Sequence, residues 1–257
     1  MDTSSSKTLS KDDCSYCLTV PHYNHFDSFV NFLPQLLSLG IPCIVIDDGS
    51  DAEQFRKLKE LLNHHSEITL LTHNINRGKG AAILTAASYA RQLGHTHIIQ
   101  IDADGQHNVD DVARLIELSK NHPHCIVSGM PKFADDAPKA RVYGRKVTTF
   151  WVALETLSFK IKDSLCGFRV YPLMEFEQVY DNYHIGSRMT FDTDILVKSC
   201  WENIDLKFID TNVIYIENNA SHFHYLRDNL LLIRLHTNLM LGMLIRIPKI
   251  IYQRFSN

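Results

Sequence analysis

The chain lacks a long uninterrupted apolar run, an excess of basic residues and a second pair of closely spaced cysteines. Its net charge of −3 argues against a dedicated nucleic-acid-binding protein, which is usually basic, so we expect no nucleic-acid partner. Cys14 and Cys17 have the spacing of zinc ligands, but without a second pair a zinc site is not expected. The polar N-terminal residues lack the apolar core of a signal peptide, so we expect a reducing, cytoplasmic setting.

Strand-like and helix-like segments alternate along the first half of the 257 residues. Short apolar runs predict strands, and apolar residues at helical spacing predict the helices between them. The strands are expected at 17–21, 43–50, 68–72, 98–101 and 125–128, and the helices at 26–39, 52–62, 81–92 and 109–121. This alternation predicts an α/β fold with a mostly parallel central sheet flanked by helices.

The pattern changes near residue 130, where a polar loop is followed by helices at 141–160 and 191–201 and a strand at 208–216. We expect residues 1–13 to be loose and residues 14–222 to form one domain. That domain has a donor half, 14–130, and an acceptor half, 131–222. Residues 223–257 are expected to form an amphipathic C-terminal helical segment.

Two carboxylates follow the apolar strand 98–101, in the sequence Asp102-Ala-Asp-Gly-Gln-His107. Residues two apart on a strand point the same way, so Asp102 and Asp104 face one side at the carboxyl end of the strand, where ligands bind in α/β sheets. Hard oxygen ligands with room for water and phosphate suit Mg²⁺ or Mn²⁺. The alternative is a polar turn with an aspartate capping the next helix. An EF-hand needs more oxygen ligands than this stretch contains.

The turn Asn76-Arg-Gly-Lys-Gly80 fits neither of two familiar phosphate-binding motifs. A P-loop needs Ser or Thr after the lysine, where this chain has Gly80, and a dinucleotide fingerprint needs a small residue where it has Ile83. The turn could still present backbone N–H groups and Lys79 to a phosphate at a helix N-terminus. A connecting turn with solvated charges is the alternative. Similarly, Asp48 could bind a nucleoside or cap the next helix.

Five motifs in order resemble the family 2 glycosyltransferases of GT-A fold. They are Val20-Pro-His-Tyr-Asn24, Ile46-Asp-Asp-Gly-Ser50, Asn76-Arg-Gly-Lys-Gly80, Asp102-Ala-Asp-Gly-Gln-His107 and Cys166-Gly-Phe-Arg169. The resemblance covers roughly residues 15–200. Within the family, the chain most resembles the branch that contains dolichyl-phosphate mannose synthase. It implies a UDP- or GDP-linked sugar donor, a divalent metal and inversion at the anomeric carbon.

The resemblance also implies roles for individual residues. Pro21, Tyr23 and Asp48 would hold the base, with Asn24, Asn76 and Lys79 also on the donor side. Asp102 and Asp104 would hold ribose, metal and diphosphate, with Gln106 in the metal shell, and Arg169 would lie near the diphosphate or the acceptor.

A hydroxyl acceptor would require a general base, whereas an ionised phosphate acceptor would not. Asp194 is the first candidate base, from its position after an aromatic residue in Phe191-Asp-Thr-Asp194, and Asp192 is the second. The alternative is that these aspartates cap the helix that follows. His222, His224 and Tyr225 could contact the donor phosphates from a closing segment, or simply end a strand.

The C-terminal segment 227–255 is apolar with spaced basic residues. Arg234 and Arg246 interrupt it, so we expect no uncharged span of the roughly 20 residues that a bilayer requires. At 100° per residue, Arg227, Arg234, Asn238 and Lys249 fall on one side of a helix that breaks or ends at Pro248. Such a helix suits peripheral contact with the inner face of the cytoplasmic membrane, or packing on the domain or on a second copy in a homodimer.

These observations favour an inverting, metal-dependent glycosyltransferase with a lipid-linked acceptor. A sugar-phosphate nucleotidyltransferase shares the α/β layout, but it normally opens with a glycine-rich basic turn where this chain has Pro21-His-Tyr-Asn24. A non-catalytic nucleotide-sugar-binding protein of the same fold is the third hypothesis, and the intact pair Asp102 and Asp104 argues against it.

Overall fold

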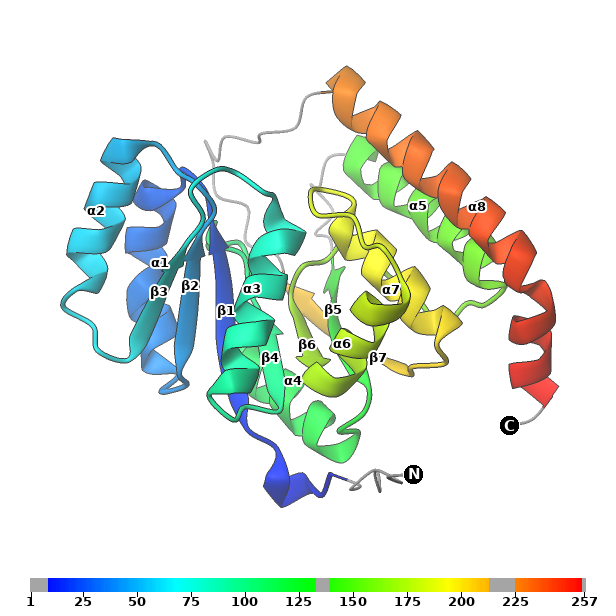
Figure 1. Cartoon of the computed structure of the whole chain (residues 1–257), viewed down its shortest axis with the longest axis horizontal. Coiled ribbons are helices and arrows are strands. Elements are labelled where there is room, and N and C mark those ends of the chain that lie inside the picture. Colours follow the sequence, from blue (N-terminus) through cyan, green and yellow to red (C-terminus); the bar gives the residue numbers. More distant parts are fainter. Residues whose placement is uncertain (1–8, 133–138, 213–224, 256–257) are drawn as a thin grey trace.

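The computed structural model describes residues 9–132, 139–212 and 225–255, which form a sheet covered on both faces by helices (Figure 1). The seven strands of the sheet are β1 (Tyr16–His22), β2 (Cys43–Asp47), β3 (Ile68–Thr72), β4 (His97–Gln100), β5 (Ile126–Lys132), β6 (Arg169–Pro172) and β7 (Leu206–Asn212). The described helices are η1 (Lys11–Asp13), α1 (Phe26–Ser38), α2 (Ala52–Leu62), α3 (Lys79–Gln92), α4 (Asp111–Asn121), α5 (Lys139–Thr156), α6 (Leu173–Asn182), α7 (Phe191–Trp201) and α8 (Tyr225–Phe255).

The strands are arranged in the order β3-β2-β1-β4-β6-β5-β7. Pairing is parallel throughout except at β6, which runs antiparallel to both β4 and β5. Strands β2, β4 and β6 are buried along their whole length, as expected for strands covered on both faces. The predicted α/β fold with a mostly parallel, helix-flanked sheet is confirmed.

Alternate residues of each strand enter two separate apolar cores. One core joins Ile44, Ile98 and Tyr171 to α3, α6 and α7, and its alanines let α3 pack closely on the sheet. The other core joins Val45 and Ile99 to α1, α2 and α4 on the opposite face. The molecule therefore has three layers, and both cores hold β4 in the middle.

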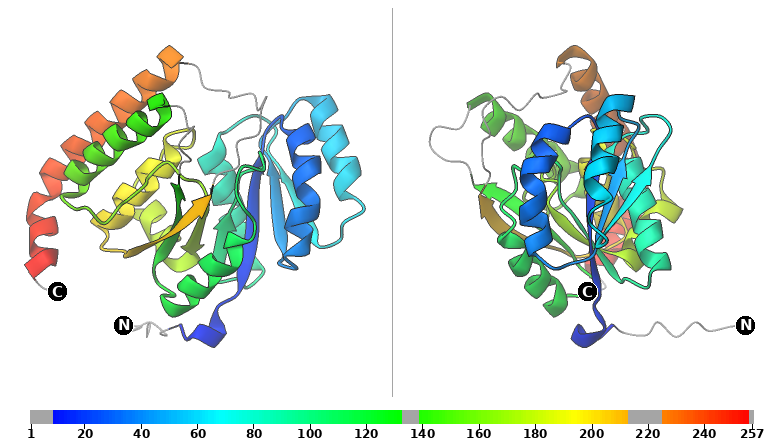
Figure 2. Two further views of the ribbon diagram at one scale, coloured as in Figure 1. Left: turned by 180° about the vertical axis from the view of Figure 1, so that it is seen from behind. Right: turned by 90° about the vertical axis from the view of Figure 1, so that its left-hand side faces the viewer.

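Helices α5 and α8 lie side by side outside α7, as two opposite views agree (Figures 1 and 2). Glu155 of α5 is fully buried and lies 2.7 Å from Nδ1 of His236 in α8. The backbone oxygen of Glu155 also accepts a 2.9 Å hydrogen bond from the indole of Trp201 in α7. These contacts join α8 to α5 and α5 to α7, so both outer helices are fixed to the layer that contains α7.

Helix α8 corrects two expectations for the C-terminal segment. Pro248 lies inside the helix, which continues to Phe255. Leu230–Tyr252 has a mean hydropathy of 1.5 and is long and apolar enough to cross a membrane by length and composition, so the expected exclusion of a spanning helix was too strict.

The predicted strand at 208–216 begins at Leu206 and is described to Asn212. His222 and His224 lie outside the described residues.

Candidate active site

The loops that follow β1, β2 and β4 meet at one edge of the sheet, because parallel strands end on the same side. The antiparallel strand β6 begins at this edge, so the residues before it lie beside the loop after β4. The turn before α3 joins them, since Asp48 accepts hydrogen bonds from the N–H groups of Arg77 and Gly78. The fold thus brings the distant sequence motifs together.

The side chain of Lys79, the first residue of α3, joins two carboxylates from distant parts of the chain. Its Nζ lies 2.8 Å from Oδ1 of Asp102 after β4, and 2.9 Å from Oδ2 of Asp192 in the first turn of α7. The amide of Gln100 donates a 3.1 Å hydrogen bond to the other oxygen of Asp192. The exposed fractions of Lys79, Asp102 and Asp192 are 24%, 28% and 12%, so the cluster is largely shielded but still reachable.

The charges of this cluster are mutually stabilised. Burial alone would lower the pKa of Lys79, but Asp102 and Asp192 outweigh burial and raise it. Burial likewise opposes ionisation of Asp102, yet Lys79 and His107 hold the pKa of Asp102 below its ordinary value. Lys79 and Asp102 are therefore both charged at neutral pH.

Gly167, immediately before Phe168 and β6, makes room for the cluster. A Cβ atom at this position would collide with Nζ of Lys79 and would lie 2.8 Å from the amide nitrogen of Gln100 and 2.9 Å from Oδ2 of Asp102. Any larger residue would therefore displace the charged side chains. The motif Cys166-Gly-Phe-Arg169 therefore requires glycine at its second position, because the side chains of the cluster approach this backbone closely.

Asp104 sits next to this cluster in a different electrostatic environment. Burial and the neighbouring charge of Asp102 raise the pKa of Asp104. Its Oδ1 accepts a 3.0 Å hydrogen bond from the backbone N–H of Gln106. A cation bound here would relieve the repulsion between Asp102 and Asp104.

Among residues 9–132, 139–212 and 225–255, no three His, Cys, Asp or Glu side chains converge on a possible metal position. Two carboxylates and the Gln106 amide can hold Mg²⁺ or Mn²⁺ only with further ligands from solvent or substrate, as is usual for Mg²⁺ bound together with phosphates. The donor set of Asp102, Asp104 and Gln106 therefore fits a cation that binds along with a diphosphate.

The backbone of the turn 76–80 is already engaged within the protein. Arg77 and Gly78 donate their N–H groups to Asp48 at 3.0 and 2.7 Å, and Gly80 donates to the carbonyl of Ser187 at 2.8 Å. The expected cradle of free N–H groups is therefore wrong for these three residues. Lys79, rather than the backbone, is the group that the turn offers to a phosphate.

Asp48 is itself buried, and its Oδ1 lies 2.6 Å from Nδ1 of His73. With its carboxylate bonded to the turn and to this histidine, Asp48 shapes the donor side of the site. Direct contact between Asp48 and the nucleobase stays a prediction that these bonds do not favour.

Other residues assigned to the donor lie around this edge. Pro21 and Tyr23 are half-buried at the end of β1. Asn24 ties that loop to the next one, because its Oδ1 accepts a 2.9 Å hydrogen bond from the N–H of Asp51. Asn76 accepts a 2.9 Å hydrogen bond from Arg188, which links the turn to the loop before α7. Asn24 and Asn76 thus position loops in this structure.

Arg169 lies inside the protein, with no exposed surface. Its guanidinium donates to the backbone oxygens of Asp192 at 2.7 Å and Ser164 at 2.8 Å, and to Ser128 and Tyr171. In this structure Arg169 holds the first turn of α7, and with it Asp192, in place. Its position near the diphosphate or the acceptor stays a prediction, and its complete burial does not favour direct contact with either.

The two candidate bases occupy different surroundings. Asp192 belongs to the Lys79 cluster. Asp194 is buried, accepts a 2.7 Å hydrogen bond from the N–H of Gly186 and lies 2.5 Å from Nζ of Lys198. Only Asp192 is therefore joined to the aspartate motif, although Asp194 was ranked first.

His107 is a site residue that the sequence did not single out for a role. Its ring stacks on Phe168 with centroids 5.1 Å apart, and its Nε2 lies 3.7 Å from Oδ2 of Asp102. Its place in the aspartate motif was the available signal. Gln100 carried no signal, because an amide within a buried strand has no characteristic pattern.

The sequence profile of glycosyl transferase family 2 matches residues 17–181 of this chain. The matched region begins at the second residue of β1 and contains β2 to β6 and the aspartate pair. The chain belongs to glycosyl transferase family 2. The family predicted from the five motifs is thus confirmed.

Two curated relatives show the range of the family near this chain. A dolichyl-phosphate beta-glucosyltransferase (ALG5D) of Trichomonas vaginalis is 32% identical over 163 residues, which are 60% of this chain and 48% of the relative. A UDP-N-acetylglucosamine–dolichyl-phosphate N-acetylglucosaminyltransferase of Methanococcus voltae is 27% identical, covering 60% of this chain and 68% of the relative. The chain thus spans about half the length of the first relative. Both names specify glucosyl or N-acetylglucosaminyl transfer, so the narrower resemblance to mannose synthase is not supported.

Solved structures share the fold of this family 2 member. Glucosyl-3-phosphoglycerate synthase of Mycobacterium tuberculosis, in complex with Mn²⁺, UDP-glucose and phosphoglyceric acid, superposes with a TM-score of 0.64 at 12% identity, over 91% of this chain and 80% of that chain. The mannosyltransferase PcManGT of Pyrobaculum calidifontis, in complex with GDP-mannose and Mn²⁺, gives 0.57 at 14% identity, over 82% and 59%. The predicted GT-A architecture is confirmed by these neighbours.

Proposed function

We propose that this chain is a metal-dependent, inverting glycosyltransferase that moves a sugar from a nucleotide-diphosphate sugar to the phosphate of a polyprenyl-type lipid. The observation that carries the proposal is the cluster of Lys79, Asp102 and Asp192 beside Asp104 at the carboxyl edge of the sheet. It combines a fixed cation for phosphate with carboxylates that fit a divalent metal. The neighbouring structures named with UDP-glucose or GDP-mannose and Mn²⁺ support this donor class.

In the proposed reaction, Lys79 would neutralise part of the charge that develops on the leaving diphosphate, and a bound divalent metal would supply further positive charge there. Asp102 holds the Lys79 ammonium in place and, together with Asp104 and Gln106, would provide the protein ligands of the metal. Arg169 and Gln100 fix Asp192 so that Lys79 is held from both sides. Attack from the face opposite the diphosphate inverts the anomeric carbon.

A phosphate acceptor agrees with the state of the candidate bases. Asp192 is paired with Lys79, and Asp194 is paired with Lys198. Neither carboxylate is placed as an isolated proton acceptor, and an ionised phosphate needs none. The dolichyl-phosphate relatives support the same acceptor class.

The proposal places the acceptor at a membrane surface, with the catalytic domain in the cytoplasm. Helices α5 and α8 carry a row of exposed apolar side chains, which we call the outer apolar face: Tyr143, Val147, Phe150, Trp151, Leu154, Leu230, Ile233, Leu241, Leu244, Ile245, Ile251 and Tyr252. Large exposed apolar patches mark membrane or protein contacts. A membrane explains why this face is uncovered beside an enzyme whose acceptor is a lipid. A second copy of the chain is the competing occupant.

The test is calorimetric titration with UDP-glucose, UDP-N-acetylglucosamine and GDP-mannose, each with and without Mn²⁺, followed by transfer to a short polyprenyl phosphate. We expect Mn²⁺-dependent binding of one donor, and a product whose anomeric configuration by NMR is opposite to that of the donor. Diphosphate release from a nucleoside triphosphate and a sugar phosphate would instead identify a nucleotidyltransferase. Metal-independent binding without transfer would identify a binding protein.

A further inference from the structure

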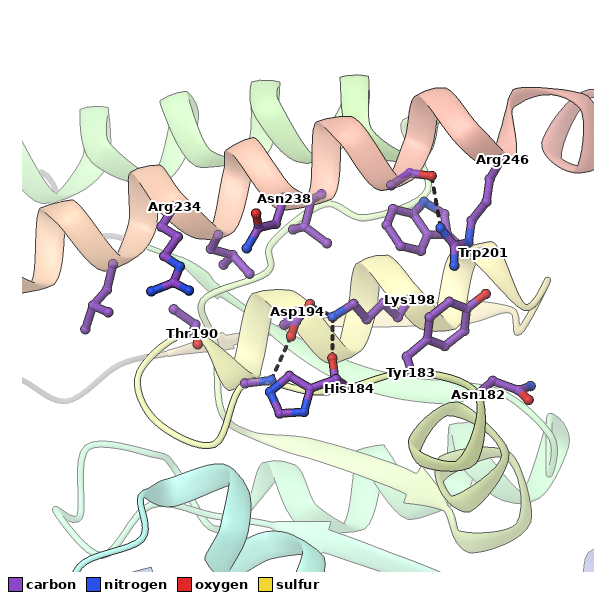
Figure 3. Close-up of a pocket in the computed structure, with 15 residues that line it drawn as sticks. Asn182, Tyr183, His184, Thr190, Asp194, Lys198, Trp201, Arg234, Asn238 and Arg246 are labelled. Carbon is purple, nitrogen blue, oxygen red and sulfur yellow. Dashed lines mark hydrogen bonds and ion pairs between the residues drawn. The ribbon is translucent and has the colours of Figure 1, made fainter.

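A cavity of about 610 Å³ lies between α7 and α8, away from the aspartate motif (Figure 3). The helix α7 contributes Asp194 and Lys198, and α8 contributes Arg234, Asn238 and Arg246. The backbone and side chains of the loop before α7 close the lower side in this view. Of the residues that the sequence placed on the basic side of α8, Arg234 and Asn238 line this cavity, whereas Lys249 does not.

The lining carries three cationic side chains and a single carboxylate. Lys198 is paired with Asp194 and also donates a 2.7 Å hydrogen bond to the carbonyl of His184. Arg246 packs its guanidinium over the ring of Trp201 at 4.7 Å and donates to the carbonyl of Gly242. The cavity therefore holds more positive than negative charge.

Arg234 is the cation that the protein leaves available. Its guanidinium makes no hydrogen bond or ion pair with the described residues, and it points from α8 across the cavity toward Thr190 (Figure 3). An arginine presents a planar set of donors that matches two oxygens of a phosphate. Asn238 lies one turn further along the same helix and adds an amide.

The cavity opens beside exposed apolar residues. Leu230 lies four residues before Arg234, and Leu241 lies three residues after Asn238, so each pair is adjacent on the helix surface. Their exposed fractions are 67% and 56%, and the next residue of this row, Ile245, is 79% exposed. A ligand with a phosphate in the cavity could lay an alkyl chain along this row.

We propose that the cavity between α7 and α8 binds the phosphate headgroup of a membrane lipid, with Arg234 as its principal contact. The inference rests on the membrane location of α8 in the proposed function and adds a lipid site separate from the donor cluster. The first turn of α7 separates the two: Asp192 points to Lys79, whereas Asp194 lines the cavity. A phosphate in this cavity would hold α8 at a fixed height on the membrane surface.

The test uses Trp201, which lines the cavity under Arg246. The chain has two tryptophans, so Trp151→Phe leaves Trp201 as the single indole fluorophore. Titration with dihexanoyl-phosphatidic acid below its micelle concentration should change the Trp201 emission saturably. Arg234→Gln should weaken this binding about tenfold, in line with the loss of a charge-assisted hydrogen-bonding partner.

Lys249→Gln is the matched control, because it removes one positive charge from α8 at a residue that does not line the cavity. We expect the control to bind the probe like the parent. Equal weakening by both variants would overturn the proposal in favour of general electrostatic attraction. Equal binding of inorganic phosphate would overturn the lipid assignment, and an unchanged Trp201 emission would overturn the site.

The proposed function is tested separately in the same variants. Arg234→Gln should leave Mn²⁺-dependent donor binding by calorimetry unchanged. If the Trp151→Phe parent shows no Trp201 response but binds the donor normally, only the lipid site is refuted. If the parent shows the Trp201 response but binds no donor, only the proposed function is refuted.

Discussion

Lys79 at the start of α3 contacts Asp192 at the start of α7, 113 residues later in the chain, with a nitrogen–oxygen distance of 2.9 Å. The contact crosses from the predicted donor half to the predicted acceptor half. It makes the position of the phosphate-facing lysine depend on a helix that belongs to the other half. Substitutions in α7 should therefore change donor binding.

Replacing Lys79 with Met should reduce both stability and donor binding. Asp102 and Asp192 would be left close together without their shared cation. Because all three side chains are partly exposed, we expect a loss of about 1–2 kcal/mol in the free energy of unfolding, less than for a fully buried pair. Urea unfolding measures it. Lys57→Met, which breaks an exposed pair on α2, should cost under about 0.5 kcal/mol. Equal losses would contradict the cluster's importance.

Asp104→Asn should abolish Mn²⁺-dependent donor binding while leaving the fold intact. The substitution keeps the size of the side chain but removes one of two carboxylates assigned to the cation, and we expect transfer to fall by about 100-fold or more, within the range for losing a key electrostatic group. Asp110→Asn, at the exposed start of α4, is the control. Unchanged transfer by the Asp104 variant would remove the metal assignment.

Gly167→Ala should damage the site through space alone. The new Cβ would press on Gln100 and Asp102, and we expect the free energy of unfolding to fall by about 1–3 kcal/mol, as in other overpacked sites. Thermal unfolding and donor titration report the two effects. Gly144→Ala, in α5 with no atom within 4 Å of the added Cβ, should instead be neutral or slightly stabilising. Tolerance of both changes would mean that the charged cluster adjusts freely.

The pKa values of Lys79 and Asp102 define a pH window for the cluster. The raised pKa of Lys79 means that its contribution to stability is complete below its ordinary value of 10.5 and is lost as pH rises through the raised one. The lowered pKa of Asp102 means that its contribution is present above 3.8 and is lost as pH falls below that value. The difference in unfolding free energy between the parent and Lys79→Met should therefore be constant from about pH 5 to 9. A difference that disappears near neutrality would contradict the pairing.

Asp104 should titrate above the ordinary aspartate value of 3.8, because burial and Asp102 both raise its pKa. The metal needs its ionised form, so cation binding should fail at a higher pH than for an exposed aspartate. Carbon-13 NMR of the metal-free protein gives the pKa directly. Asp102→Asn should lower the pKa of Asp104 by removing the like charge, and an unmoved value would show that burial acts alone.

The outer apolar face should determine vesicle association. Leu244→Glu with Ile245→Glu should release the protein from sedimenting vesicles, because both side chains are more than half exposed on α8. Leu93→Glu, at the end of α3 and also more than half exposed, is the control. Carbonate extraction separates a surface helix, which is released, from a spanning one. A shift from dimer to monomer in the double variant without lipid would favour the second copy as occupant.

The sequence was most informative where local chemistry fixes local structure. The strands β1 to β5 and the helices between them followed from short apolar runs and helical spacing, and α7 was predicted with both ends correct, at Phe191 and Trp201. Helix α6 was missed, since it follows β6 directly with Pro172 as its N-cap and no polar cap signal. The direction of β6 could not be predicted, because its four residues are buried on both faces and carry no alternation.

Contacts between residues far apart in the sequence limited how much of the site could be predicted. The aspartate motif was found, but the partnership of Lys79 with Asp192 depends on α7 packing against α3. Charged residues are rarely buried, so the sequence did not predict the complete burial of Arg169 or its support of the first turn of α7. On α8 the sequence placed Arg234 and Asn238 on one side, but only the fold shows that both line a cavity next to α7.

The insertion of β6 between β4 and β5 has a consequence for how the chain folds. Strand β5 spans the middle of the sequence, yet its neighbours in the sheet, β6 and β7, both come from the second half. A fragment that stops at Lys132, the end of β5, would leave β5 without either neighbour and would expose the edge of β4. Neither this fragment nor the remaining C-terminal fragment should fold on its own. Mixing the two should restore a native spectrum only if they assemble during refolding. Denaturation of the intact chain should accordingly follow a single cooperative step.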